Sequence, residues 1–251
     1  MTVAERLDLA RPREIRDLLG TAIRIYLGHL PTVLAVGAAV VVPVQLIVAG
    51  IGLEELTSSY RETSTTAETV LPTVVSFLVI APLLAAITIH VLQRLAAGDA
   101  PRPGPALQAG LDVFPPVFLA VLLAAGAIAV GLAIFIVPGI FLAVRLYFVA
   151  QNAVVDRAHG IDALRHSWEL TRGFWWRTLG VVLLANLLAL LPGLLVVVPL
   201  QSIAESADRQ WISLAGMILA ETLTAPFVAL VSVLLFYDLR ARRAAATAPM
   251  S

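Results

Sequence analysis

Residues 179–200 read LGVVLLANLLALLPGLLVVVPL, 22 positions without one charged side chain. A helix that crosses about 30 Å of hydrocarbon needs roughly 20 mostly apolar residues, so this stretch is long enough to span a membrane. Four further stretches have the same character, at residues 31–52, 71–93, 116–137 and 212–237. The sequence therefore predicts an all-α integral membrane bundle and not a soluble domain.

The composition supports the same class. Of the 251 residues, 59% are hydrophobic and only 14% are charged, with a mean hydropathy of +0.92, whereas soluble domains have roughly 25% charged residues. The 17 basic residues, all Arg, balance 17 acidic ones, and this zero net charge argues against a nucleic-acid partner. The chain has no Cys, which excludes disulfides and thiolate metal sites. Membrane lipids are the expected partners, with other membrane proteins as a second class.

A sixth span is predicted at residues 140–155, although it is short and contains Arg145, Gln151 and Asn152. Cytoplasmic loops of membrane proteins collect Arg and Lys. With this span included, 14 of the 17 Arg residues fall on one side of the membrane, and without it seven of them move across. We therefore predict six spans with both termini in the cytoplasm. Residues 1–243 form one domain, and residues 244–251 are expected to be a disordered tail.

A threefold internal repeat is predicted from the segments that precede three of the spans. Residues 13–30, 105–115 and 161–176 have apolar residues at helical spacing. The three segments share a pattern of Leu, two residues, a small residue, an apolar residue, a charge and an aliphatic residue, at Leu19–Ile25, Leu107–Val113 and Leu164–Leu170. Each copy is expected to be a cytoplasmic interfacial helix followed by a transmembrane hairpin.

The third of these helices mixes aromatic and basic residues. Trp175 and Trp176 fall at a predicted membrane border, where aromatic rings concentrate. Basic side chains near that surface attract anionic lipid, so lipid headgroups are the expected contacts of Arg165, Arg172 and Arg177.

Polar residues inside the predicted spans form a candidate site. Arg145 and Glu221 are the charged residues well inside spans, and Gln45 falls in the same outer half of the bundle. Charges at such depth normally face the bundle interior and are paired, so we predict an Arg145–Glu221 pair in which Gln45 satisfies a remaining donor. Three interpretations remain open: a ligand or proton site, a purely structural pair, or an Arg145 that reaches outward while Glu221 stays protonated.

Pro138-Gly139 is predicted to be the tight outer turn between the third and fourth spans, because Pro presets φ and Gly accepts positive φ. No glycine-rich phosphate loop, nucleophile elbow or zinc-binding HExxH helix occurs in the sequence. We therefore predict no enzyme activity, no catalytic residues, no metal site and no cofactor.

Two stretches of the chain resemble a known family. Pro138-Gly139-Ile140, Arg145 and the pattern Ala163-Leu164, Ser167, Leu170-Thr171, Gly173 and Trp176 form the first, and Leu234–Leu239 with Arg240 and Arg242 forms the second. Both are similar to the membrane-domain family named after glycerophosphoryl diester phosphodiesterase, whose members are mostly uncharacterised bacterial six-span proteins. The resemblance implies a location in the bacterial cytoplasmic membrane. It also implies that Asp238 and Arg240 lock the last span against the cytoplasmic helices, through Arg165 or Arg172.

The catalytic phosphodiesterase domain of some relatives is absent from these 251 residues, so the resemblance implies no hydrolase. The leading functional hypothesis is a non-enzymatic membrane module that organises or assists protein partners or lipids. The alternative is a lipid or small-solute transporter with a polar site near Arg145 and Glu221. A filled bundle core would favour the module, and a cavity lined by the polar residues would favour transport.

Overall fold

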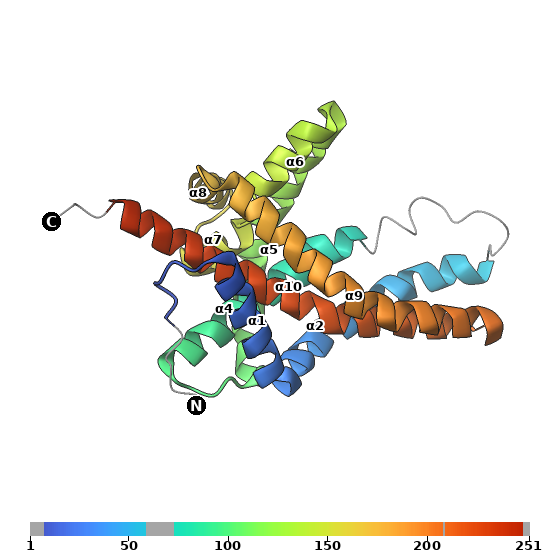
Figure 1. Cartoon of the computed structure of the whole chain (residues 1–251). Helices are drawn as coiled ribbons and strands as arrows, with labels where there is room; N and C mark the ends of the chain where they lie inside the picture. The colour runs from blue at the N-terminus through green and yellow to red at the C-terminus, as the bar shows by residue number, and fades with distance from the viewer. Residues whose placement is uncertain (1–7, 59–72, 208, 248–251) are drawn as a thin grey trace.

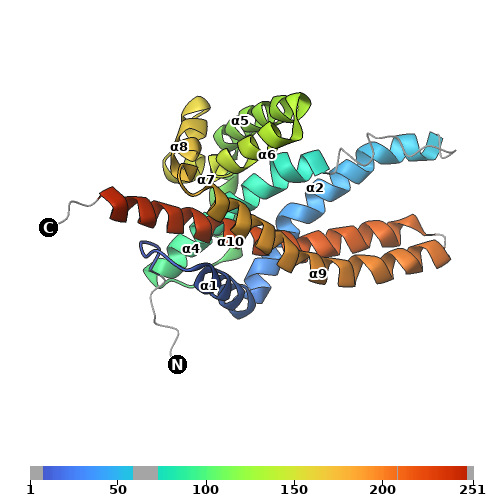
Figure 2. The same ribbon diagram turned by 45° about the horizontal axis from the view of Figure 1, so that its top comes forward.

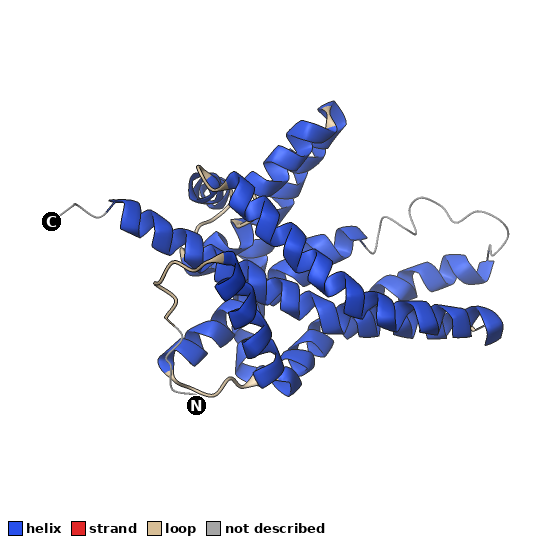
Figure 3. Cartoon of the chain, viewed as in Figure 1, coloured by secondary structure: helices blue, strands red, loops and turns tan. Residues whose placement is uncertain are grey.

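The computed structural model describes residues 8–58, 73–207 and 209–247, and within these ranges the chain is helical and contains no strand (Figures 1 and 3). Six of the described segments are long and apolar enough to cross a membrane. The prediction of six such segments is confirmed, and the chain is a multi-pass membrane protein. Its elements are α1 (Ile15–Gly28), α2 (Leu30–Ser58), η1 (Ser76–Ile80), α4 (Ala81–Ala97), α5 (Pro103–Ile134), α6 (Ile136–Arg145), α7 (Val149–Val155), α8 (Ile161–Thr171), α9 (Trp175–Ala207) and α10 (Gln210–Thr247).

Helix α10 is the centre of the bundle. It packs against α9, α2, α4 and α1, and it runs through the middle of the molecule in Figure 1. Residues 229–236 are buried on every side, as expected for a helix segment that is apolar all round. The largest core cluster surrounds this segment with side chains from α1, α4, α8 and α9.

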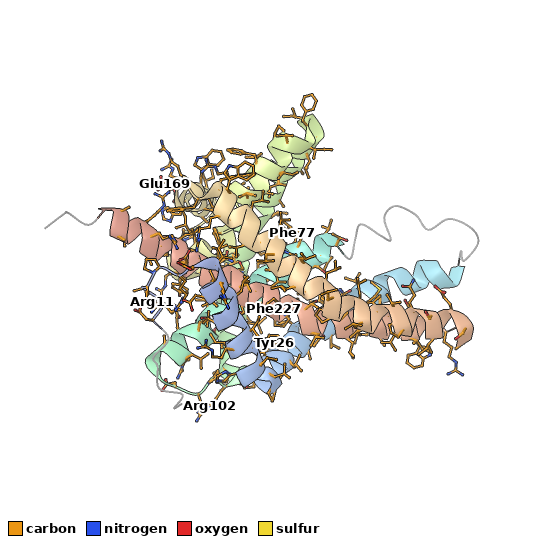
Figure 4. The ribbon with its side chains drawn as sticks, in the orientation of Figure 1. Arg11, Tyr26, Phe77, Arg102, Glu169 and Phe227 are labelled. Carbon is orange, nitrogen blue, oxygen red and sulfur yellow. The ribbon has the colours of Figure 1, made fainter. Side chains whose placement is uncertain are left out.

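Helix α1 is bound to α10 through one apolar face, formed by Leu18, Leu19, Ala22 and Tyr26. The Tyr26 ring stands edge-on to Phe227 with centroids 5.7 Å apart, and its hydroxyl donates to the Leu223 carbonyl at 2.7 Å (Figure 4). The helix ends at Gly28, slightly before the predicted Leu30, because the backbone at His29 leaves the helical conformation before α2 begins.

Three predicted boundaries differ from the structure. The segment 105–115 is not a separate helix, because α5 continues through Pro115 and Pro116 as one helix. The fourth span is broken between α6 and α7. Helix α10 continues to Thr247 and so includes the beginning of the predicted tail, whose residues 248–251 lie outside the described ranges. The threefold repeat stays a prediction. The leading helix expected for its second copy is the first part of α5.

The predicted turn at Pro138-Gly139 is wrong. The chain turns at Phe135, whose backbone is extended (φ −159°, ψ 154°), and both residues lie in the first turns of α6. A Pro near a helix start is tolerated because the N–H groups of the first turn have no intrahelical acceptor. Gly139 instead allows close packing: a Cβ added there would lie 2.9 Å from the Leu132 Cα of α5.

We expect Gly139→Ala to lower the free energy of unfolding by about 1–3 kcal/mol, the usual cost of forcing extra atoms into a packed contact. Gly126→Ala, in α5, is the matched control because an added Cβ there meets nothing within 4 Å. This control should leave stability unchanged or raise it. Reversible unfolding in mixed micelles measures both, and equal effects would contradict the role given to Gly139.

The two long hairpins diverge from a common base. Helices α5 and α6 form one hairpin and α9 and α10 the other, and their far ends separate in both views (Figures 1 and 2). We call the end of the molecule at which Asp238 lies the basal end.

Candidate functional site

A buried carboxylate organises the basal end. Asp238 has no exposed surface and accepts hydrogen bonds from three groups: the Arg13 backbone N–H at 2.6 Å, Arg177 Nε at 3.0 Å, and Arg242 Nε at 3.1 Å to each carboxylate oxygen. The Arg13 carbonyl in turn accepts from both guanidinium groups at 2.6 Å. This Asp238 cluster therefore ties the segment before α1 to α9 and α10.

Asp238 does lock the last helix, but through other partners than the resemblance implied. Its guanidinium partners are Arg177 and Arg242, not Arg165 or Arg172. Arg177 was predicted to contact lipid headgroups, and this is corrected because its side chain is mostly buried against Asp238. Burial also lowers the pKa of the neighbouring Arg13 guanidinium.

The C-terminal part of α10 makes a second set of basal contacts. Arg240 binds Asp156 just after α7, with 2.6 Å between Nη1 and Oδ1, and its guanidinium lies over the Phe236 ring. Arg243 donates to the carbonyls of Leu170 and Arg172 at the end of α8. Arg165, Arg172 and Trp176 keep exposed side chains, so headgroup contact remains open to them as a prediction.

The break between α6 and α7 is supported by α8. Ser167 is fully buried, donates to the Arg145 carbonyl at 2.9 Å and accepts from the Phe148 N–H at 3.1 Å. Thr171 also reaches the Arg145 carbonyl, at 3.3 Å. Backbone groups freed by a broken helix inside a membrane protein need such partners. The chain then turns at Gly173 (φ +83°) and begins α9.

The predicted Arg145–Glu221 pair is wrong. The Arg145 guanidinium lies over the rings of Phe141 and Trp168, 5.1 and 4.9 Å from their centroids, and Nη1 reaches the Trp168 carbonyl at 3.5 Å. Among the described residues it has no ion pair within 4.0 Å. The reason is that Arg145 ends α6 against α8, at the basal end.

Glu221 and Gln45 do meet, but Gln45 is a donor to Glu221 and does not serve Arg145. The Gln45 side-chain amide donates to a Glu221 carboxylate oxygen, joining α2 to α10. Gln45 is buried, and Glu221 is partly exposed toward a cavity. This contact is what the structure retains of the predicted polar cluster.

That cavity lies between the two hairpins. It has a volume of about 880 Å³ and lies between η1 and α4, α5, α6, α7, α9 and α10. Ile140, Leu190 and Leu194 line it and are also exposed on the surface of the molecule, so it opens sideways between α6 and α9. Phe77, labelled in Figure 4, lies at its η1 edge.

The cavity is mostly apolar, with a small group of polar side chains on its α7–α10 wall. Gln151, only 3% exposed, donates through Nε2 to Ser232 Oγ at 2.7 Å, and Tyr147 lies beside Ser232. Within the described part of the chain, no donor reaches Gln151 Oε1. Among the described residues that line the cavity, Glu221 has the one carboxylate, and no Arg or His lines it.

Sequence reasoning missed Gln151 and Ser232 as a pair. The signal that was available is the presence of two polar residues, Gln151 and Asn152, within a short apolar segment. On the sequence alone, they were only a reason to doubt that the segment spans the membrane. Asn152 serves the helix itself, since its Nδ2 donates to the Phe148 carbonyl at 2.8 Å. Pairing Gln151 with Ser232 requires knowing that α7 crosses α10, 81 residues later.

A family described as "Domain of unknown function (DUF7847)" has a sequence model that matches residues 105–239. This range holds α6 to α9 entirely, together with most of α5 and α10 as far as Leu239, and so includes the main walls of the cavity and Asp238. No curated protein matches the chain, and no solved structure matches it. The resemblance to the glycerophosphoryl diester phosphodiesterase membrane domain stays a prediction.

Proposed function

The chain belongs to the DUF7847 family, to which no activity is assigned, and we propose that it is a non-enzymatic membrane module that binds a lipid in the cavity between α6 and α9. The observation that carries this proposal is the cavity itself, whose wall is mostly apolar. Of the polar residues expected to line a transport path, Glu221 lines this cavity, whereas Arg145 and Gln45 are not among its lining residues. An apolar pocket with a few convergent polar groups is the usual form of a small-molecule site. The side chains at the opening of this pocket are apolar and exposed, so lipid chains can enter between them.

The lining chemistry favours a neutral headgroup. A phosphate is bound most strongly by cationic donors, and the described residues that line the cavity include no Arg or His, while Glu221 would repel an anion. A hydroxyl both donates and accepts, so it suits a wall that combines the Glu221 carboxylate with the Gln151–Ser232 pair. The proposed ligand is therefore a neutral, hydroxyl-bearing membrane lipid with its chains along the apolar wall.

The test fills the cavity and counts bound lipid. Ala143→Phe places a ring in the cavity wall of α6, and Ala129→Phe makes the same change at an exposed position of α5 outside the lining. In native mass spectrometry of the purified protein, we expect a neutral lipid enriched over bulk membrane, reduced at least tenfold by Ala143→Phe and retained with Ala129→Phe. Retention in both variants, or enrichment of phospholipid alone, would overturn the proposal.

Transport is the second candidate, and the Glu221–Gln45 contact favours it. A carboxylate facing an intramembrane cavity is a functional candidate by default, and Glu221 reaches this one with Gln45 as its donor. If the module moves its ligand, Glu221→Gln should abolish flux in reconstituted vesicles while binding persists. Unchanged flux in that variant, or a wild-type protein without flux, would leave binding alone as the function.

We also propose that the basal end faces the cytoplasm of a bacterial cell membrane, with both termini on that side. The support is charge: Arg13, Arg177, Arg240, Arg242 and Arg243 gather at this end, and basic residues are enriched on the cytoplasmic side of membranes. A reporter enzyme that works only in the cytoplasm should be active when fused after residue 251, and one that works only outside the cytoplasm should be inactive there. The opposite result would show that the basal end faces outward.

A further inference from the structure

We propose that the α5–α6 hairpin does not cross the bilayer: it enters the leaflet at the basal end, turns near the middle of the membrane and returns to the same side. This inference is independent of the lipid site. It assigns the exposed tip of the hairpin, residues 130–141, to contact with the acyl chains of one leaflet. Three observations carry it: the composition of the tip, the length of α6 and the contacts that fix the far end of α6.

The tip contains no polar side chain. Residues 130–141 read VGLAIFIVPGIF, and Phe135, Ile136 and Val137 are 73%, 70% and 77% exposed. Of the residues that dominate turns, namely Gly, Pro, Asn, Asp and Ser, the tip contains Gly and Pro but none of the three with a polar side chain. The turn from α9 to α10, by contrast, has polar side chains on both sides: Gln201 and Glu205 lie in the last turns of α9, and Arg209 comes just before α10. An exposed surface with the composition of the tip is suited to hydrocarbon.

Helix α6 is too short to reach the opposite surface. Its ten residues extend about 15 Å at 1.5 Å per residue, which is half of the roughly 30 Å of hydrocarbon in a bilayer. The tip can therefore lie no farther than about 15 Å from Arg145 along this helix. Helix α9, with 33 residues, extends about 50 Å and reaches well beyond the tip.

The far end of α6 is fixed at the basal end. The Arg145 carbonyl is bound by Ser167 and Thr171 of α8. Within α6, the Phe141 carbonyl accepts from Trp175 Nε1 at 3.4 Å, and Trp175 begins α9 two residues before Arg177, the partner of Asp238. Helix α7 does not lengthen the hairpin, because Asp156 after it binds Arg240, also at the basal end.

The ribbon views agree with this placement. In Figures 1 and 2 the hairpin leaves the base at a marked slant to α9 and α10, and its tip ends well short of the far end of those helices. Both ends of the hairpin lie at the base, so the topology of the rest of the chain is the same whether or not it crosses.

The experiment measures the depth of the tip. Because the chain has no Cys, single Cys residues can be placed at Val137 in the tip, at Glu205 near the end of α9 and at Asp99 at the basal end. Nitroxide labels on these positions, in the full chain reconstituted in phospholipid vesicles, report depth through their collisions with oxygen and with a water-soluble nickel chelate. We expect the Val137→Cys label near the bilayer centre, and the Glu205→Cys and Asp99→Cys labels at the two surfaces.

A second readout uses a membrane-impermeant maleimide on sealed vesicles of either orientation. In each orientation, Val137→Cys should react at least tenfold more slowly than the control position on the side that faces the reagent, and at a rate similar to both controls after detergent is added. Phe135→Cys, also exposed in the tip, repeats the test at a second position in case one variant misfolds. A tip label at the depth of the Glu205 label, or tip labelling from that side at the control rate, would overturn the proposal.

Discussion

Replacing Asp238 with Asn should lower the free energy of unfolding by about 3 kcal/mol, because removing one member of a buried ionic cluster leaves its partners unpaired. Asp238 is fully buried and binds Arg177, Arg242 and the Arg13 N–H. The neutral amide keeps the shape of the carboxylate, so packing is preserved. The decrease in the free energy of unfolding then comes from the loss of the negative charge. Unfolding of the purified protein in mixed micelles measures the change.

Asp99→Asn is the control for this prediction. Asp99 also binds a guanidinium, that of Arg94 at 3.2 Å, but both side chains are more than half exposed. Exposed ion pairs contribute between 0 and about 1 kcal/mol, so the control should lose little. Similar losses in the two variants would mean that Asp238 stabilises the protein no more than a surface carboxylate does.

Ser167→Ala should cost about 2 kcal/mol, the order expected when buried donors and acceptors lose their partner. The Ser167 hydroxyl is the hydrogen-bond partner of both the Phe148 N–H and the Arg145 carbonyl at the break between α6 and α7. Thr171 still reaches the carbonyl in the variant, whereas the Phe148 N–H would be left without this acceptor. The same micelle assay measures the loss.

Ser202→Ala provides the comparison. Its hydroxyl donates to the Val198 carbonyl within its own helix, and the side chain is exposed. Substitutions of this kind usually change stability by no more than about 0.5 kcal/mol. If Ser167→Ala were as mild as Ser202→Ala, the backbone at the break would not depend on α8.

The apolar segments were predictable because a run of about 20 apolar residues is itself the physical requirement for a membrane helix. The residues at which each helix begins and ends were less predictable. Pro115 and Pro116 suggested a boundary, but the helix α5 continues through them. Pro138-Gly139 suggested a turn, but Gly139 is needed for close contact with Leu132, and a turn and a helix contact use Gly for different reasons.

The candidate site was only partly predictable. The membrane depth of each polar residue was counted along the sequence, on the assumption that every apolar segment crosses the bilayer. That count placed Arg145 near Glu221, whereas the structure ties Arg145 to α8 at the basal end. Gln45 and Glu221 were correctly brought together because both belong to long, regular helices. The cavity depends on the angle between two hairpins, which no residue pattern in one helix determines.

The Asp238 cluster has a consequence for the order in which the chain is completed during synthesis. Arg13 and Asp238 are separated by 225 positions, and a ribosome that adds about 5–20 residues per second needs roughly 10–45 s to make that interval. Throughout this time the segment before α1 has none of its final partners in α10. The first part of the chain to emerge is therefore fastened among the last, and a nascent protein truncated before Asp238 lacks the Asp238 and Arg242 contacts of the segment before α1.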